Sequence, residues 1–162
     1  MDYDPRWPEM FTREAERIRS VLGRRALRVE HVGSTAVPGL AAKPVIDVLL
    51  EVVDSADEAA YALALETAGY VLRIREPGWQ QHRLFKGLHP DANLHVFSHG
   101  RSEIERMLLF RDWLRSNAAD RELYASTKLA LGRKKWKDVQ DYADAKTAVV
   151  EEILARARSA GS

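Results

Sequence analysis

The strongest constraint on the fold is a nearly continuous apolar run from Val45 to Val53, interrupted only by Asp47 and Glu51. A run of this length is typical of a central strand that is buried on both faces of a sheet. A carboxylate inside such a strand is costly to bury unless it has a partner such as a cation. Asp47 is therefore the first candidate for a functional residue.

Hydrophobic periodicity predicts a mixed α/β (α+β) fold, with one central sheet, flanking helices and a C-terminal helical pack. Ser55 is expected to cap the second helix. The sheet core (about 24–98) runs into the helical part (about 101–158) without a linker, so we expect one domain over residues 1–162. Helices are predicted near 8–22, 56–68, 101–116, 120–133 and 138–158, and strands near 27–33, 45–53, 70–75, 82–88 and 92–97.

Composition excludes several functional classes. The chain has 162 residues, of which 46% are apolar, enough to bury a core. Its 25 Lys and Arg against 24 Asp and Glu leave a net charge of +1, so bulk charge favours neither a nucleic acid nor a membrane surface as a partner. The absence of cysteine excludes disulfides, thiolate metal sites and a cysteine nucleophile. No signal-like or membrane-spanning run is present, so we expect a cytoplasmic protein; its oligomeric state stays open.

The small-residue loop after the first predicted strand is a candidate phosphate site. Gly33 and Ser34, followed by Thr35, leave the strand and open a short helix, which directs backbone N–H groups and a hydroxyl outward. Lys43 either adds positive charge for a phosphate or pairs with Asp47. In the alternative without a phosphate site, Gly33 and Ser34 form an ordinary turn, and Asp47 is a structural carboxylate that caps the preceding loop.

The chain resembles the GrpB family, whose fold belongs to the nucleotidyltransferase superfamily. The resemblance lies in residues 30–48, 93–97 and 109–114 and in Tyr124, Lys128, Tyr142 and Lys146. It implies that Gly33 and Ser34 hold a triphosphate. It also implies two carboxylates spaced Asp-x-Asp/Glu on the next strand and a third on a later strand, which together hold two catalytic metal ions.

The sequence departs from that superfamily pattern beside Asp47. The partner carboxylate is expected at residue 45 or 49, and both are apolar; Glu51 lies ~13 Å further along the strand. His95 falls where the resemblance places the third carboxylate, and His31 precedes the Gly-Ser pair. We therefore predict that Asp47 and His95, with His31 as a further ligand, hold one divalent ion: Mg²⁺ or Mn²⁺, with Zn²⁺ as an alternative.

Three basic residues of the C-terminal helices are further candidates for phosphate binding. Arg111 either reaches the substrate or forms an internal ion pair. Lys128 and Lys146 each lie four residues after a tyrosine, so each pair shares a helix face that either overlooks the cleft or packs between the helices. The basic cluster at 133–137 is typical of a solvated helix end, with a nucleic acid as the alternative partner.

Two functional hypotheses follow. In the first, the chain is a metal-dependent enzyme that transfers a nucleotidyl group from a nucleoside triphosphate to a small acceptor, with Asp47 as the catalytic residue. In the second, it is a non-catalytic module that binds a nucleotide or another phosphorylated metabolite, having lost the second carboxylate. The loss of that acid at residues 45 and 49 favours the module, whereas the retained loop and Asp47 favour a ligand site of some kind.

Overall fold

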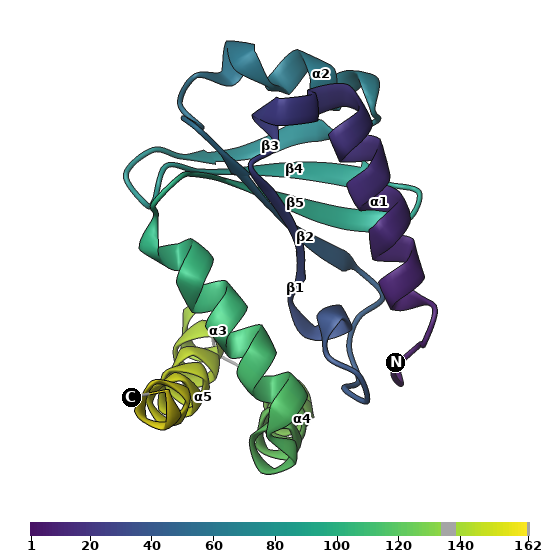
Figure 1. Cartoon of the computed structure of the whole chain (residues 1–162). Coiled ribbons are helices and arrows are strands. Elements are labelled where there is room, and N and C mark those ends of the chain that lie inside the picture. The colour runs from purple at the N-terminus through teal and green to yellow at the C-terminus, as the bar shows by residue number, and fades with distance from the viewer. Residues whose placement is uncertain (134–138, 162) are drawn as a thin grey trace. The chain divides into compact units, whose positions relative to one another are not determined.

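A computed structural model describes residues 1–133 and 139–161 (Figure 1). The expected class, a mixed α/β fold with flanking helices, is confirmed. Its elements in chain order are α1 (Trp7–Leu22), η1 (Gly23–Arg25), β1 (Arg28–Val32), η2 (Ser34–Ala36), β2 (Ile46–Val52), η3 (Glu58–Ala60), α2 (Ala62–Thr67), β3 (Val71–Glu76), β4 (His82–Leu88), β5 (Asp91–Ser98), α3 (Ser102–Ser116), α4 (Ala118–Arg133) and α5 (Val139–Ala160), where η marks a 3₁₀ helix.

The sheet has five strands in the order β1-β2-β5-β4-β3. Its centre is the parallel pair β2 and β5, and the other neighbouring strands pair antiparallel. The apolar run that opened the sequence analysis forms β2, which is buried between two partners as expected. Because β5 inserts beside β2, Asp47 pairs in register with Asn93, and Leu49 pairs with His95.

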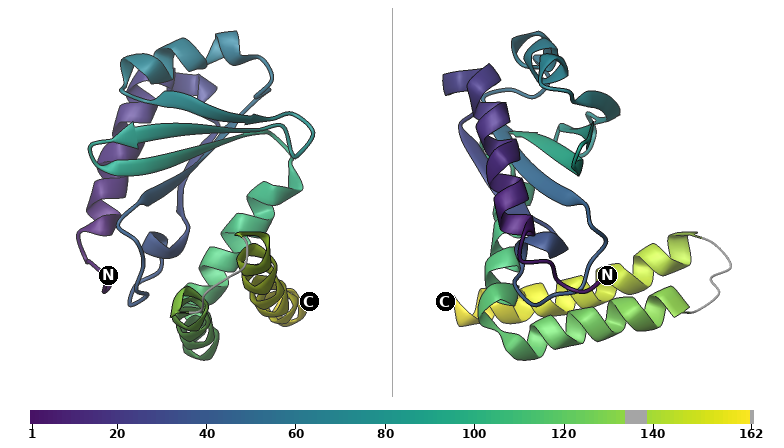
Figure 2. Two further views of the ribbon diagram at one scale, coloured as in Figure 1. Left: turned by 180° about the vertical axis from the view of Figure 1, so that it is seen from behind. Right: turned by 90° about the vertical axis from the view of Figure 1, so that its right-hand side faces the viewer.

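One face of the sheet carries the apolar core of residues 1–107. Residues 46, 48, 50 and 52 of β2 point to this face, where they meet α1 and α2. Ile18 of α1 and Leu65 of α2 are fully buried there, and Figure 2 shows α1 lying alongside the strands. Since strand side chains alternate between faces, residues 47, 49 and 51 point to the opposite face.

The opposite face of the sheet is polar at its centre. Strand pairing places Asp47, His95 and His82 on this face, on the adjacent strands β2, β5 and β4. Glu51 lies at the other end of β2, where it contacts His99 at 2.5 Å. The polar residues of three strands therefore meet on one surface.

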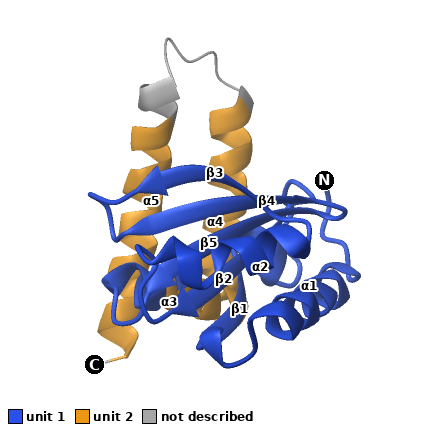
Figure 3. Ribbon diagram, turned by 90° about the horizontal axis from the view of Figure 1, so that it is seen from above, with its two compact units in different colours: residues 1–107 blue, residues 108–162 orange. Residues whose placement is uncertain are grey.

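The chain divides into two compact units, residues 1–107 and 108–162 (Figure 3). In the second unit, α4 and α5 pack together, and Arg156 of α5 donates hydrogen bonds to Asp120 of α4 at 2.6 Å. Phe110 meets Tyr124 edge to face with ring centroids 5.2 Å apart. Among the described residues, no helix has the length and apolarity needed to cross a membrane.

The predicted helix at 56–68 is wrong in its first half. The structure has the short η3 and then α2, which begins only at Ala62. Ser55 caps neither, because its hydroxyl donates to the backbone carbonyl of Gln81 at 2.6 Å. Tyr61 is buried and donates its hydroxyl to the carbonyl of Ser55 at 2.6 Å, which holds this segment out of a continuous helix.

Candidate functional site

Gly33 and Asp47 lie against each other at the start of the polar face. Val32, the last residue of β1, pairs with Asp47 of β2, so the chain leaves the sheet beside this carboxylate. Gly33 has φ 75°, a conformation that favours glycine. A Cβ atom on Gly33 would stand 2.5 Å from Oδ2 of Asp47. The Asp47 carboxylate therefore packs directly against the backbone of the Gly-Ser turn.

A chain of three hydrogen bonds runs across the sheet from Asp47. Oδ1 of Asp47 lies 3.2 Å from Nε2 of His95. Nδ1 of His95 lies 3.1 Å from Nε2 of His82, and Nδ1 of His82 lies 2.7 Å from Oε1 of Glu76. The two imidazole rings are stacked with centroids 5.3 Å apart. Four side chains from β2, β5, β4 and β3 thus form one continuous array.

Proton counting shows that this array needs one further positive charge. Three hydrogen bonds require three protons, whereas two ionised carboxylates and two neutral imidazoles supply only two. Either one more proton binds the array, or a cation takes the place of the proton between Asp47 and His95. In the second case both imidazoles stay neutral, His95 donates to His82, and His82 donates to Glu76.

The environment of His82 disfavours a charge at that ring. Burial lowers the pKa of His82, and the neighbouring Glu76 only partly opposes this effect. The Asp47–His95 end of the array is more open, since the two side chains are 27% and 22% exposed. This end is the one that adjoins the Gly-Ser turn.

The geometry at Asp47 and His95 fits a divalent ion. Two ligand atoms at ~2.1 Å from one ion lie about 3 Å apart when they occupy adjacent positions, and the observed separation is 3.2 Å. The His82–Glu76 pair behind His95 is the kind of outer partner that orients a metal-binding imidazole. Among the described residues, no group of three or more His, Asp or Glu side chains is arranged to hold a metal. The remaining ligands would be water or the oxygens of a phosphate.

His31 does not join this site. Its ring lies on the opposite face of the sheet, where it stacks on Phe11 with centroids 4.8 Å apart. Its Nε2 bonds the hydroxyl of Thr35 at 2.9 Å, and Thr35 donates to the carbonyl of Val45 at 3.2 Å. The structure therefore separates His31 from Asp47 and His95, and the Thr35 hydroxyl is already engaged in the buried side of the loop.

Ser34 and Lys43 lie in the connection between β1 and β2. Ser34 is half-buried at the first position of η2, directly after Gly33. Lys43 is exposed, three residues before β2. Their roles in phosphate binding stay predictions.

A cavity of about 450 Å³ opens beside His95 on the same face of the sheet. His82 and His95 form part of its wall, together with the rings of Trp79 and Phe97. The carboxylates of Glu76 and Glu103 also line it. The hydrogen-bonded array thus runs from the Gly-Ser turn to the wall of a cavity of small-molecule size.

Comparison with known proteins identifies the family. The model of the family described as GrpB protein matches residues 1–156. This chain belongs to the GrpB family. A UPF0157 protein of Halalkalibacterium halodurans is 63% identical over 98% of this chain and 82% of its own length. The crystal structure of the conserved protein GrpB from Enterococcus faecalis has a TM-score of 0.82 and 32% identity, covering 97% of this chain and 95% of that one.

A further relative of this GrpB-family chain carries the name of an enzyme. A dephospho-CoA kinase of Mycobacterium bovis is 32% identical over 88% of this chain, and the match spans 42% of that protein. A GrpB-like segment therefore occupies part of a longer chain whose name refers to a kinase.

The predicted basic residues of the GrpB C-terminal helices lie in the second unit. Arg111 forms an ion pair at 2.9 Å with the neighbouring Asp112, whose side chain is exposed. Lys128 lies 5.0 Å from the ring centre of Tyr124, so this pair does share a helix face. Lys146 is half-buried on α5. The side chain of Tyr142 and residues 134–137 of the basic cluster lie outside the described residues, and the substrate roles of these groups stay predictions.

Sequence reasoning missed His82, Glu76 and Trp79. His82 begins a strand after a Pro-Gly turn, and this position alone gives no signal for a site. The missing information was the strand order, because only the placement of β5 between β2 and β4 aligns His82 with His95. The sequence could have predicted the face of His31, because His31 lies two residues after the buried Val29 and therefore on the same side of the strand.

Proposed function

We propose that this GrpB-family chain binds a nucleotide through its phosphates at the Gly33–Ser34 turn and transfers the nucleotidyl group to a small acceptor. The observation that carries the proposal is the contact between this turn and Asp47, whose carboxylate begins the array that includes His95. Outward-facing backbone N–H groups in such a turn suit a phosphate. The dephospho-CoA kinase name of one relative agrees with a nucleotide-related role.

Asp47 and His95 would hold a divalent ion together with the phosphate oxygens. Such an ion, when bound, polarises the phosphorus–oxygen bonds and neutralises the charge of the departing pyrophosphate. The chain's own contribution is to fix the carboxylate, to orient His95 through His82, and to present the turn to the phosphate. These are the functions expected of a nucleotidyltransferase-like fold that uses one carboxylate in place of two.

In the proposed reaction, an acceptor oxygen or nitrogen attacks the α-phosphorus of the nucleotide. The bond between that phosphorus and the bridging oxygen of pyrophosphate breaks, and the acceptor loses a proton. This proton passes to solvent.

A non-catalytic binding module is the second candidate. One observation favours it: Leu49 is fully buried on the face that Asp47 shares, so no second carboxylate stands at the neighbouring position of β2. The module would bind the same nucleotide at the same turn without turnover.

The deciding experiment is a transfer assay with nucleoside triphosphates labelled at the α-phosphate, mixed small acceptors, and Mg²⁺ or Mn²⁺. We expect label in an acceptor with the wild-type chain, and a loss of about 100-fold or more with Asp47→Asn. Asp57→Asn, an exposed carboxylate beyond the far end of β2, is the matched control and should retain activity. Binding of labelled nucleotide without transfer would select the module, and equal behaviour of wild type and Asp47→Asn would reject both.

A further inference from the structure

The cavity beside His95 has an acidic lining. Its charged residues are Glu76 and Glu103, and none of its described lining residues is Lys or Arg. Arg106 bonds Glu103 at 3.1 Å but does not line the cavity. A second phosphate would be repelled here, whereas a positively charged ligand would be attracted.

Aromatic rings form adjoining walls of the same cavity. Trp79 meets Phe97 at 6.0 Å with an interplanar angle of 68°, and meets His82 at 5.3 Å and 80°. Trp79 is nevertheless 44% exposed, which is unusual for so large an apolar ring. The faces of indole and phenyl rings carry partial negative charge and attract cations within ~6 Å.

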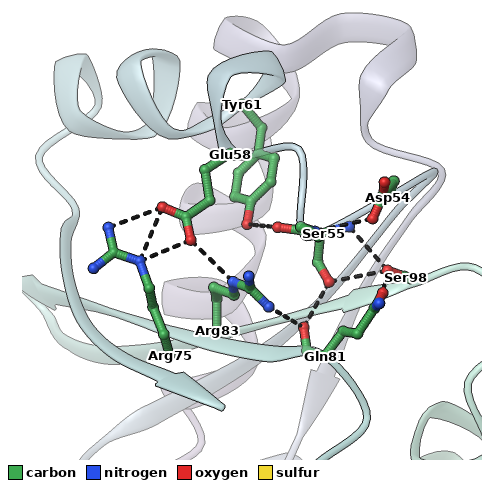
Figure 4. Close-up of polar contacts among 9 residues, drawn as sticks. Asp54, Ser55, Glu58, Tyr61, Arg75, Gln81, Arg83 and Ser98 are labelled. Atoms are coloured by element: carbon green, nitrogen blue, oxygen red, sulfur yellow. Dashed lines mark hydrogen bonds and ion pairs between the residues drawn. The ribbon is translucent and has the colours of Figure 1, made fainter. Parts of the chain in front are cut away.

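The turn that carries Trp79 is held in a fixed conformation. Gln80 and Gln81 both have positive φ values, 56° and 52°, a conformation that costs a non-glycine residue about 1 kcal/mol or more. Ser55 and Arg83 both donate hydrogen bonds to the backbone carbonyl of Gln81, at 2.6 and 3.0 Å (Figure 4).

Side-chain bonds add to this support. The hydroxyl of Ser98 donates to the side chain of Gln81 at 3.0 Å, and Glu58 binds Arg83 at 3.0 Å. The side chain of Gln80 accepts a hydrogen bond from the backbone N–H of Glu103 at 3.3 Å. The wall formed by Trp79 is thus connected both to the sheet and to the helix that supplies Glu103, so the cavity is preorganised for a ligand.

We propose that this cavity binds an organic cation, an alkylammonium group lying against the Trp79 ring and close to the carboxylates of Glu76 and Glu103. Resting on the proposed function, this cation is the acceptor: its ammonium group occupies the cavity, and its nucleophilic oxygen or nitrogen extends past His95 toward the phosphate. The two ends of the array then serve the two substrates, with the phosphate at Asp47 and the cation at Glu76.

Choline and its neutral isostere 3,3-dimethylbutan-1-ol provide a direct test, since they share a shape and differ in charge. Binding is followed by NMR titration of the full chain without metal or nucleotide. We expect choline to bind at least 10-fold more tightly than the isostere. Trp79→Leu should weaken choline binding about 5- to 30-fold, whereas Trp79→Phe should retain most of it. Glu103→Gln should weaken binding, and Glu105→Gln, an exposed residue of the same helix, should not.

Three outcomes would overturn the cation site: equal binding of choline and the isostere, choline binding that survives Trp79→Leu in a folded variant, or binding of adenosine in place of choline. The two proposals can fail separately. Asp47→Asn should leave choline binding unchanged, so a chain that binds choline but transfers no nucleotidyl group keeps the cation site and loses the acceptor role. Transfer to uncharged acceptors alone would remove the cation proposal and keep the enzyme.

Discussion

The carboxylate of Asp47 stands where a side chain on residue 33 would begin: a Cβ atom there would lie 2.5 Å from Oδ2. We predict that Gly33→Ala destabilises the chain by about 2 kcal/mol or more, because the clash adds to the strain of a positive φ. Gly39→Ala is the matched control, since Gly39 has φ 83° and no neighbouring atom within 4 Å. Urea unfolding of both variants measures the difference.

A double mutant sharpens this test. Removing the carboxylate in Asp47→Ala should make Gly33→Ala less costly, with a coupling of about 0.5–3 kcal/mol. Two results would contradict this prediction: equal destabilisation by Gly33→Ala and Gly39→Ala, or free-energy changes of Gly33→Ala and Asp47→Ala that simply add. Either would mean that the contact with Asp47 does not determine the need for glycine at residue 33.

His82 should influence metal binding although it is not a proposed ligand. Its ring bonds Nδ1 of His95 at 3.1 Å and so fixes the orientation of that imidazole. We predict that His82→Ala weakens Mn²⁺ binding about 10-fold or more, as loss of an outer partner does at other metal sites. Calorimetric titration is the measurement, and the exposed His89→Ala is the control. Unchanged affinity in folded His82→Ala would show that the array does not support a metal.

The Asp120–Arg156 pair should make the stability of the second unit depend on pH. Hydrogen bonds from Arg156 are the main cause that lowers the pKa of Asp120, and Trp113 adds to them. Because the folded-state pKa lies below the unfolded value of ~3.9, the ionised carboxylate stabilises the fold above that value. This contribution is lost as the pH falls through the folded-state pKa.

We therefore predict that Asp120→Asn costs about 2 kcal/mol near neutral pH and that its stability changes less than that of wild type between pH 5 and pH 2. Thermal unfolding across this range is the measurement. Glu122→Gln, which removes an exposed carboxylate from the same helix, should stay within about 0.5 kcal/mol of wild type. Parallel pH profiles for wild type and Asp120→Asn would contradict the assignment.

Ser55 should affect both the stability of the chain and ligand binding in the cavity. It is fully buried, and its hydroxyl contacts both the Gln81 carbonyl and the Ser98 hydroxyl. We predict that Ser55→Ala destabilises the chain by about 1–3 kcal/mol and also weakens choline binding, because the turn carrying Trp79 loses an anchor. The exposed Ser126→Ala should affect neither quantity. Normal choline affinity in a destabilised Ser55→Ala would limit Ser55 to a structural role.

The sequence predicted the elements that are defined by local patterns. The apolar run 45–53 identified the central strand, and alternation placed Asp47 and Glu51 on one face of it. Gly33 was predicted to leave the strand and open a short helix, and in the structure it lies between β1 and the short η2. The helix at 56–68 failed because Ser55 and Tyr61 bond to distant or non-helical groups, which no local pattern reveals.

The candidate site was only partly predictable for the same physical reason. The proximity of Asp47 and His95 followed from the resemblance, but their link to His82 and Glu76 depends on which strands are neighbours. The assignment of His31 beside Asp47 ignored its alternation with Val29, which places it on the buried face. Trp79 was passed over because an aromatic residue in a turn gives no sequence signal for a cavity wall.

The parallel pairing of β2 with β5 has a consequence for how the protein is made. A ribosome releases Asp47 long before His95, and β4, the hairpin partner of β5, emerges between them. A nascent chain that has not yet delivered residues 91–98 contains the glycine turn and its carboxylate but lacks His95. The Asp47–His95 pair must therefore await insertion of the last strand into the middle of the sheet.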